Sequence, residues 1–290
     1  GNGADSSNKS DAFKVMFNGD TYISSSLYLG GTAITATAAE LNLLDGVTAI
    51  GSGILSSVTE NSNTGVRLTT SNAANHGDIG SNAVDLSYQN STSSTKGATG
   101  YAATALGYLT TASGNQSTSM GELTTASGRE TLAIGNSTTA SGDYSTAMGL
   151  STTASGAQST AMGRLTTASG ISSLALGYST TASGSSSTAM GEFTTASASY
   201  STSIGYGTTT SDYGSLVIGR YNSSGSSVTN SATAFSTSNT AFVIGNGADF
   251  FNKSDAFKVM FNGDATIGND AIIGNDLTVS GDVVVSSDAR

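Results

Sequence analysis

Residues 145–156, STAMGLSTTASG, contain the pattern that determines the fold, because both halves of it recur at intervals of 14 residues. The residue before each glycine of the first half is Leu, Met or Ile. A second glycine series, to which Gly156 belongs, runs from Gly100 to Gly184 and then gives way to Ala198 and Asp212. The first series is unbroken and comprises Gly107, Gly121, Gly135, Gly149, Gly163, Gly177, Gly191, Gly205 and Gly219. A fixed period of this kind indicates a repeat architecture.

The period of 14 equals two heptads, but a coiled coil is excluded because each glycine in a helix interior costs about 1 kcal/mol. Ser145–Met148 and Thr152–Ser155, each followed by glycine, predict two short strands joined by turns in which glycine adopts positive φ. Each unit is therefore expected to be one coil of an all-β parallel solenoid. We expect the alanines equivalent to Ala154 to face the Leu, Met and Ile residues across a flat interior.

A coil of 14 residues encloses too few bulky side chains to be stable as a monomer. Several identical rolls packed side by side would supply the missing burial. The sequence therefore predicts a homotrimer.

The alternation of Ser145-Thr-Ala-Met-Gly149 with Thr153-Ala-Ser-Gly156 resembles the head repeats of trimeric autotransporter adhesins over about residues 97–221. The resemblance implies a left-handed parallel β-roll in an intertwined homotrimer, outside the cell. Phage fibres and other surface appendages are similar in using this roll.

The flanking segments follow other patterns. Residues 1–20 recur as 245–264 with only Ser6 and Ser7 changed, to Phe250 and Phe251, which suggests a longer tandem polypeptide that extends further towards the N-terminus. Residues 37–46 carry a capping box and a terminal glycine, and predict a short helix. Residues 34–48 resemble a spacer of phage tail-fibre proteins.

Residues 264–290 repeat Asp and an apolar residue every six positions, which predicts a triple-stranded β-helical stalk built from three chains. Ser287-Asp-Ala-Arg290 resembles the entry to a removable chaperone domain of phage fibres. The expected organisation is an N-terminal strand segment (1–31), a spacer with irregular strands (32–96), the β-roll (97–221), a connector (222–244) and the stalk (245–290).

The composition lacks most of the side chains from which enzyme active sites are usually built. Cysteine, proline and tryptophan are absent. The net charge is −10, and the sequence contains no cluster of basic residues that could bind along a phosphate backbone, so we expect no nucleic-acid partner. There is no apolar run long enough to insert in a membrane. The one histidine, His76, lies in a polar stretch and is expected to be exposed.

No catalytic residues, cofactor or metal are predicted. Glu122 and Glu192 occupy equivalent positions five coils apart, about 24 Å, which prevents them from cooperating on a glycosidic bond. We therefore expect no enzyme.

Residues that vary from coil to coil are expected to lie in turns on a rigid rod, where binding surfaces usually lie. The candidates for surface contact are Tyr108, Glu122, Arg129, Tyr144, Arg164, Tyr178, Glu192, Tyr200 and Tyr206. The sequence favours a structural, adhesive trimeric fibre, such as a phage tail fibre or another extracellular appendage, that attaches to a glycan or protein on a host surface and can join end to end. The alternatives are a polysaccharide-cleaving tailspike and an ice-binding solenoid, the latter weakened because neighbouring threonines point to opposite faces.

Overall fold

The structure, a computed structural model, describes residues 54–270 and 281, together with four short strands among the first 53 residues. These strands form two antiparallel pairs, β1 (Phe13–Val15) with β2 (Thr21–Ile23) and β3 (Tyr28–Leu29) with β4 (Thr32–Ala33). Residues 1–53 are one unit and residues 54–290 another. The helix expected at residues 37–46 lies outside the described residues, as do residues 271–280 and 282–290 of the expected stalk.

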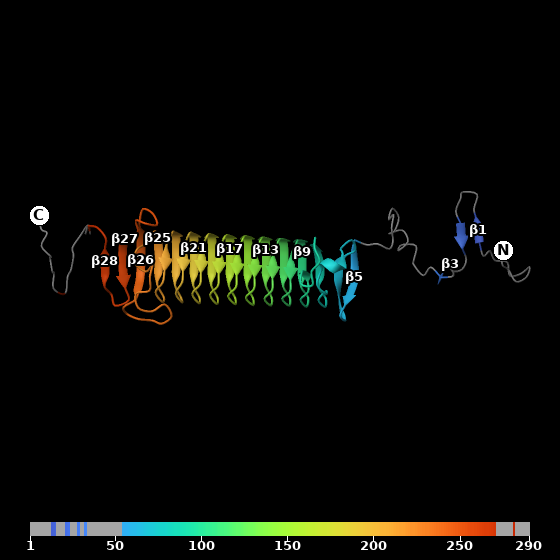
Figure 1. Cartoon of the computed structure of the whole chain (residues 1–290), viewed down its shortest axis with the longest axis horizontal. Coiled ribbons are helices and arrows are strands. Elements are labelled where there is room, and N and C mark those ends of the chain that lie inside the picture. Colours follow the sequence, from blue (N-terminus) through green and yellow to red (C-terminus); the bar gives the residue numbers. More distant parts are fainter. Residues whose placement is uncertain are drawn as a thin grey trace, which may run out of the picture. The chain divides into compact units, whose positions relative to one another are not determined.

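The second unit is a β-solenoid with two sheets that are parallel throughout the regular coils, so the predicted all-β solenoid class is confirmed (Figure 1). Each regular coil contributes a five-residue strand to the long sheet and a two-residue strand to the short sheet. The regular long-sheet strands are β9 (Thr104–Tyr108), β11 (Thr118–Glu122), β13 (Leu132–Asn136), β15 (Thr146–Leu150), β17 (Thr160–Arg164), β19 (Leu174–Tyr178), β21 (Thr188–Glu192), β23 (Thr202–Tyr206) and β25 (Leu216–Arg220). The short-sheet strands are β8 (Gly97–Ala98), β10 (Thr111–Ala112), β12 (Thr125–Ala126), β14 (Thr139–Ala140), β16 (Thr153–Ala154), β18 (Thr167–Ala168), β20 (Thr181–Ala182), β22 (Thr195–Ala196) and β24 (Thr209–Thr210).

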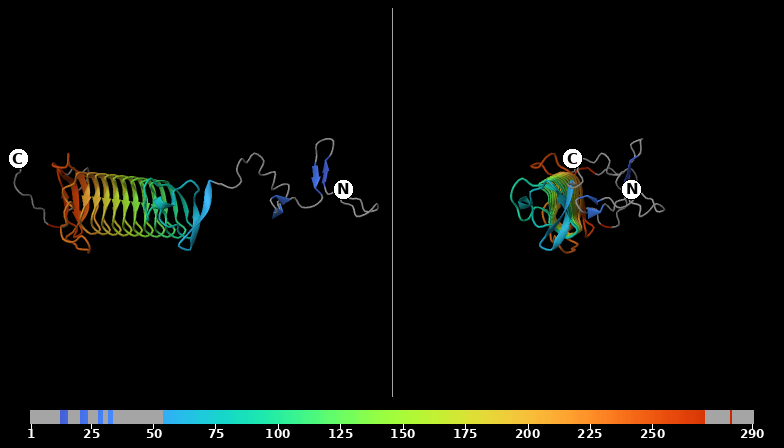
Figure 2. Two further views of the ribbon diagram at one scale, coloured as in Figure 1. Left: turned by 45° about the vertical axis from the view of Figure 1, so that its right-hand side comes forward. Right: turned by 90° about the vertical axis from the view of Figure 1, so that its right-hand side faces the viewer.

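The coils stack in exact register, because each residue pairs with the residue 14 positions further on. Met148 lies beside Met162 and Gly149 beside Gly163 in the long sheet, and Ala154 lies beside Ala168 in the short sheet. The end-on view in Figure 2 shows the coils superimposed on one another. Any side chain that repeats with the period therefore forms a straight column along the roll.

The long sheet continues beyond the regular coils at both ends. On the N-terminal side it includes the hairpin of β5 (Leu55–Glu60) and β6 (Asn63–Leu68), followed by β7 (Val84–Tyr88), which pairs in parallel with β9. A 3₁₀ turn at Ala73–Asn75 lies between β6 and β7. On the C-terminal side β26 (Thr240–Asn246) pairs in parallel with β25, and β27 (Asp255–Met260) and β28 (Ala265–Ile267) follow in antiparallel order.

The interior of the roll corrects one expectation from the sequence. The alanines equivalent to Ala154 do not face the Leu, Met and Ile column; they face a second column of small residues, represented by Ala147, and both alanines are fully buried. Met148 is only partly buried, because it follows Ala147 on the strand and therefore points outward. Two alanine faces make an interior too thin for larger side chains.

Buried hydroxyl groups flank the two alanine columns. Thr152 is fully buried while its neighbour Thr153 is partly exposed, so adjacent threonines point to opposite sides as predicted. The Oγ1 atoms of Thr110, Thr138, Thr152, Thr166, Thr180 and Thr194 are buried without a hydrogen-bond partner. In the two coils where serine replaces the facing alanine, the threonine is paired: Ser119 with Thr124 at 2.7 Å and Ser203 with Thr208 at 2.9 Å.

Both glycine series are required by the close approach of successive coils, and the first series also has positive φ. Gly149 and its equivalents lie within the long strands, not in turns, with positive φ (124° at Gly149). Gly156 is not among the residues with positive φ. A Cβ on Gly156 would lie 2.0 Å from the carbonyl oxygen of Gly170, so this series is required by the close approach of successive coils. The sequence predicted positive φ in turns for both series. The first series has positive φ but lies within strands, and Gly156 of the second series does not have positive φ.

Asp212, which replaces glycine at the end of the second series, anchors the connector that follows the roll. Its carboxylate is fully buried and accepts hydrogen bonds from the backbone N–H of Thr229, at 2.6 Å, and of Thr240, at 2.8 Å. Asn222 closes the short sheet, because its side-chain amide pairs with both the N–H and the carbonyl of Thr209. The polar side chains at this end thus satisfy backbone groups that a further coil would otherwise satisfy.

Candidate functional site

An apolar stripe runs along the outer face of the long sheet. It consists of Leu106, Met120, Ile134, Met148, Met162, Leu176, Met190, Ile204 and Ile218, the residues that precede the first glycine series. Leu106, Met120 and Ile204 are 36–38% exposed, and the others are partly buried. Strand register places all nine in one straight column, because each pairs with its equivalent in the next coil. A contiguous apolar column of this length on a surface indicates an interaction face.

Six of the nine candidate contact residues belong to a second column, the strand-end ridge, formed by the residues that follow the first glycine series. The candidates on it are Tyr108, Glu122, Arg164, Tyr178, Glu192 and Tyr206. They are the last residues of long-sheet strands, not turn residues as expected, because the strand continues through the glycine. All six are at least partly exposed.

The strand-end ridge becomes aromatic towards its C-terminal end. Arg164 lies over the ring of Tyr178, with 5.2 Å between the guanidinium carbon and the ring centroid. Phe193, in the adjoining turn, packs edge-on between Tyr178 and Tyr206 at 5.3 and 5.8 Å. Tyr206 in turn packs edge-on against Tyr221 at 5.2 Å. The structure therefore brings candidates from three different coils into one continuous aromatic surface.

The other three candidates, Arg129, Tyr144 and Tyr200, lie in or beside the second turn of their coils, where they were expected. The Arg129 guanidinium lies 4.9 Å from the centroid of the Tyr144 ring and 3.4 Å from the carboxylate of Asp143. Tyr200 is 59% exposed and packs edge-on against Tyr213 at 5.3 Å. These contacts are separate from the strand-end ridge, so the nine candidates form two groups.

His76 is buried, which corrects the expectation that it is exposed. Its Nδ1 lies 2.8 Å from Oδ2 of Asp85, whose carboxylate is fully buried at the first coil of the roll. Ser87 donates its hydroxyl to the other carboxylate oxygen at 2.6 Å. Burial raises the pKa of Asp85, but the hydrogen bonds from His76 and Ser87 outweigh it and hold this pKa below its usual value.

Arg67 completes this buried polar cluster. Its guanidinium pairs with the Glu60 carboxylate at 2.8 Å and donates to the carbonyl of Gly77 at 3.1 Å. Partial burial raises the pKa of Glu60, whereas the hydrogen bonds from Arg67 and from the backbone N–H of Ile79 lower it, and the net change is downward. The cluster closes the N-terminal end of the roll with paired charges, as buried charges require.

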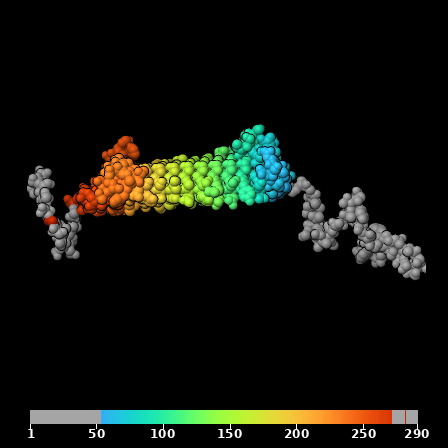
Figure 3. Space-filling view, turned by 90° about the horizontal axis from the view of Figure 1, so that it is seen from below, coloured from blue at the N-terminus to red at the C-terminus, as the bar shows by residue number. Residues whose placement is uncertain are grey.

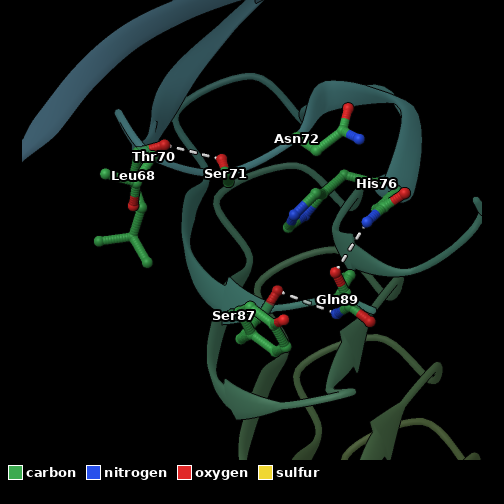
Figure 4. Close-up of a pocket in the computed structure, with 9 residues that line it drawn as sticks. Leu68, Thr70, Ser71, Asn72, His76, Ser87 and Gln89 are labelled. Atoms are coloured by element: carbon green, nitrogen blue, oxygen red, sulfur yellow. Dashed lines mark hydrogen bonds between the residues drawn. The ribbon is translucent and has the colours of Figure 1, made fainter. Parts of the chain in front are cut away.

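A pocket of about 380 Å³ opens beside His76 and is shown in Figure 4. It is lined by Leu68, Thr70, Ser71, Asn72, Asn75, His76, Ser87, Tyr88 and Gln89. Gln89 donates a hydrogen bond to Ser87 Oγ at 3.0 Å, and Ser87 donates to Asp85. Because the serine hydroxyl is directed to the carboxylate and not to the imidazole, this arrangement does not activate a nucleophile.

Two features are absent from the part of the chain that the structure describes. Among these residues, no group of three or more His, Cys, Asp or Glu side chains is placed to hold a metal ion. No helix there is long and apolar enough to cross a membrane.

The family comparison agrees with this geometry. The family model described as the YadA head domain repeat matches at residues 98–121, 126–152, 140–166, 154–180, 168–194, 182–208 and 196–222. Within residues 98–222, all but 122–125 are similar to YadA head repeats. The YadA head is the head of a trimeric autotransporter adhesin, so the resemblance drawn from the sequence is confirmed. A comparison with curated proteins found no significant match.

The family match indicates that residues 98–222 form an adhesin-like β-solenoid. Sequence reasoning missed the outward direction of the apolar stripe and the roles of Asp85 and Asp212 at the two ends. The sequence contained a signal for the stripe. Strand alternation points Met148 in the opposite direction to Ala147, and the position equivalent to 147 is alanine or serine in every regular coil except the last, which has Val217. The contacts of Asp85 and Asp212 join strands and loops far apart in sequence, and no local pattern marks them.

Proposed function

We propose that the chain forms a homotrimeric rod that attaches a phage tail fibre or a similar extracellular appendage to a host surface. The observation that carries this proposal is the apolar stripe on the outer face of the long sheet. Apart from Val217 in β25, the regular strands bury alanine and small hydroxyl residues, so the larger apolar side chains of the stripe remain available for contacts between chains. Three chains that bring their stripes together would remove them from water.

The stripe is apolar in every coil, whereas the strand-end ridge changes from coil to coil. A uniform column suits a contact with identical copies of the same chain, because every coil meets an equivalent coil. A varied column suits recognition of an external partner. Tyr108, Tyr144, Tyr178 and Tyr200 offer amphipathic contact area at low entropic cost, and the arginines and glutamates add charge.

The trimer contact can be tested by cysteine labelling, since the chain contains no cysteine. Met120→Cys places a thiol on the stripe, where the side chain is 36% exposed in a single chain. Ser127→Cys places one at the exposed position directly after short-sheet strand β12 in the same coil and serves as the matched control. We expect maleimide to react rapidly with the Ser127→Cys variant and slowly with the Met120→Cys variant until the trimer is unfolded. Equal rates in the native protein would contradict the proposed contact face.

Attachment is tested by measuring the binding of fluorescent protein to candidate host cells. In one variant the six candidates on the strand-end ridge are replaced by serine, and in a second variant Arg129, Tyr144 and Tyr200 are replaced. Each variant should lose binding to the cells while keeping the native mass of the original protein. If both variants bind as well as the original chain, the proposed contact surface is wrong.

The tailspike alternative receives no support from the position of the carboxylates on the ridge. Glu122 and Glu192 end strands β11 and β21, which are five coils apart, or about 24 Å at the usual strand spacing. Glycosidase carboxylates lie roughly 5–10 Å apart. We therefore expect no release of reducing sugar when the protein is incubated with host polysaccharide.

A further inference from the structure

A second pocket, of about 370 Å³, lies at the C-terminal end of the strand-end ridge. Aromatic rings, threonine hydroxyls and one ammonium group surround it. The lining residues are Phe193, Thr195, Gly207, Thr209, Tyr221, Phe250 and Lys253. Figure 3 shows that the surface of the roll is even along the green and yellow coils and that part of the orange C-terminal segment stands out from it.

The pocket is built from two parts of the chain that are fixed to each other. The loop between β26 and β27 carries Phe250 and Lys253, and it is tied to the last regular coil by two backbone hydrogen bonds: Gly247 N–H to the carbonyl of Arg220, at 2.9 Å, and Ser254 N–H to the carbonyl of Tyr221, at 3.1 Å. Within the loop, Asp249 accepts hydrogen bonds from the backbone N–H groups of Phe251 and Asn252, both at 2.8 Å. A preorganised wall of this kind lowers the entropic cost of binding.

Gly207 makes room for the wall of the pocket. The equivalent position in the preceding coil is Phe193, and a Cβ on Gly207 would lie 2.4 Å from the ring of Tyr221. Because glycine occupies this position, the Tyr221 ring lies over the turn of the preceding coil.

Two cations lie against the aromatic faces. The Lys253 ammonium is 4.9 Å from the centroid of the Phe250 ring. The Arg220 guanidinium is 5.6 Å from the centroid of Tyr206 and 5.5 Å from that of Tyr221. Two carboxylates are close by. That of Asp249 is occupied by its hydrogen bonds within the loop, and Glu192 lies beside Tyr206 on the neighbouring strand. In a chain of net charge −10, this end of the ridge therefore combines flat apolar surfaces with positive charge.

The duplicated segment shows that the phenylalanines are specific to this copy. Residues 245–264 repeat residues 1–20 except that Phe250 and Phe251 replace Ser6 and Ser7. Phe250 is 65% and Phe251 90% exposed, so neither contributes much to the core. Adjacent exposed phenylalanines are costly on a soluble surface unless they have a binding role.

The pocket remains accessible if the apolar stripes meet in a trimer. Thr195 and Thr209 begin short-sheet strands, and they are partly exposed while Ala196 and Thr210 beside them are buried. The pocket therefore lies over the outer face of the short sheet, whereas the stripe lies on the outer face of the long sheet.

We propose that this pocket binds a carboxylate-bearing sugar unit, such as a hexuronic or sialic acid residue, of a surface glycan. The C–H face of the sugar ring packs on Phe250, Tyr221 and Phe193, its carboxylate pairs with Lys253, and the threonine hydroxyls meet its hydroxyl groups. This inference rests on the proposed attachment function and specifies the ligand class of one site on the fibre.

The test uses the full chain and two pairs of probes, measured by saturation-transfer-difference NMR and titration. Trigalacturonic acid is compared with its methyl ester, and 3′-sialyllactose with lactose, so that each pair differs in charge. We expect at least one acid to bind at least tenfold more tightly than its neutral counterpart, with the difference reduced at high salt. Binding by one pair alone would identify the source of the carboxylate. The inference is overturned if neither acid binds or if each binds no better than its counterpart.

Three variants locate the site. F250S/F251S restores the residues of the first copy and is expected to abolish binding, and Lys253→Met keeps the apolar stem while removing the charge and should weaken acid binding at least tenfold. Lys96→Met, at the opposite end of the roll, is the matched control and should bind normally. If a trimer that attaches to cells binds acidic sugars equally with and without Lys253, the inference fails while the proposed function stands. If the original chain is not a trimer and does not attach to host cells, that result would instead contradict the proposed function.

Discussion

Replacing Ala147 with serine is expected to stabilise the roll. The Thr152 hydroxyl, which is buried in the same coil, has no hydrogen-bond partner. In the equivalent pair two coils earlier, Ser119 stands at the alanine position and pairs with Thr124 at 2.7 Å. Ser119 and Ala147 occupy the same position in the strand register, so the added hydroxyl should meet Thr152 in the same geometry.

The magnitude follows from the usual net contribution of a buried hydrogen bond, about 1 kcal/mol per added pair. The free energy of unfolding, measured by guanidinium denaturation at one fixed protein concentration, should rise by about that amount. Thr152→Val, which removes an unpaired hydroxyl, should also be neutral or stabilising. In the double mutant the new serine hydroxyl has no hydrogen-bond partner. The double mutant should therefore be less stable than Ala147→Ser alone by about 1–3 kcal/mol.

The matched comparison is Thr124→Val, which leaves Ser119 without its partner. This change should destabilise the protein by about 1–3 kcal/mol, the opposite direction from Thr152→Val. If Thr124→Val and Thr152→Val have the same effect, or if Ala147→Ser destabilises the protein, the account of the interior hydroxyl groups is refuted.

Three further outcomes are expected. Gly149→Ala should destabilise the roll by more than about 3 kcal/mol in denaturation experiments, because the new Cβ would lie 1.9 Å from the carbonyl oxygen of Gly163. The control is Gly263→Ala, where φ is also positive but the new Cβ would have no atom within 4 Å, so it should cost only about 1–2 kcal/mol. Below about pH 4 the strands near Asp85 should lose hydrogen-exchange protection, since a carboxylate with a lowered pKa contributes stability that is present above its unfolded value and lost as the pH falls through its folded value. Asp85→Asn should lack this acid transition. Asp212→Asn should make the connector more sensitive to protease, because an amide nitrogen would then face a backbone N–H that now donates to the carboxylate.

The regular coils could be predicted closely from sequence, because each residue type recurs at a fixed interval. The strands at Thr146–Leu150 and Thr153–Ala154 overlap the expected segments, although the first continues through Gly149, and the register of 14 is the period itself. The direction of the side chains was harder. Pairing large with small residues is usual in protein interiors, and it placed Met148 inside, whereas alternation from the buried Ala147 places it outside.

The ends of the roll could not be predicted, because there the structure depends on contacts between segments that are distant in sequence. His76 lies between Asn75 and Gly77 in the chain, yet it is buried against Asp85, which also pairs with Arg67 from another strand. The aromatic pocket likewise combines Phe193, Tyr221 and Phe250, which come from two turns and a hairpin loop. Its only sequence signal was the change from serine to phenylalanine between the two copies of the duplicated segment.

The central claim, that the apolar stripe is a contact between copies of this chain, is tested most directly by the native mass in solution. Multi-angle light scattering should give three times 28.7 kDa, and serine substitutions along the stripe should shift the mass to that of one chain or prevent folding. A stable, folded species of 28.7 kDa from the original sequence would contradict the claim, because the stripe would then be exposed to water along the whole roll.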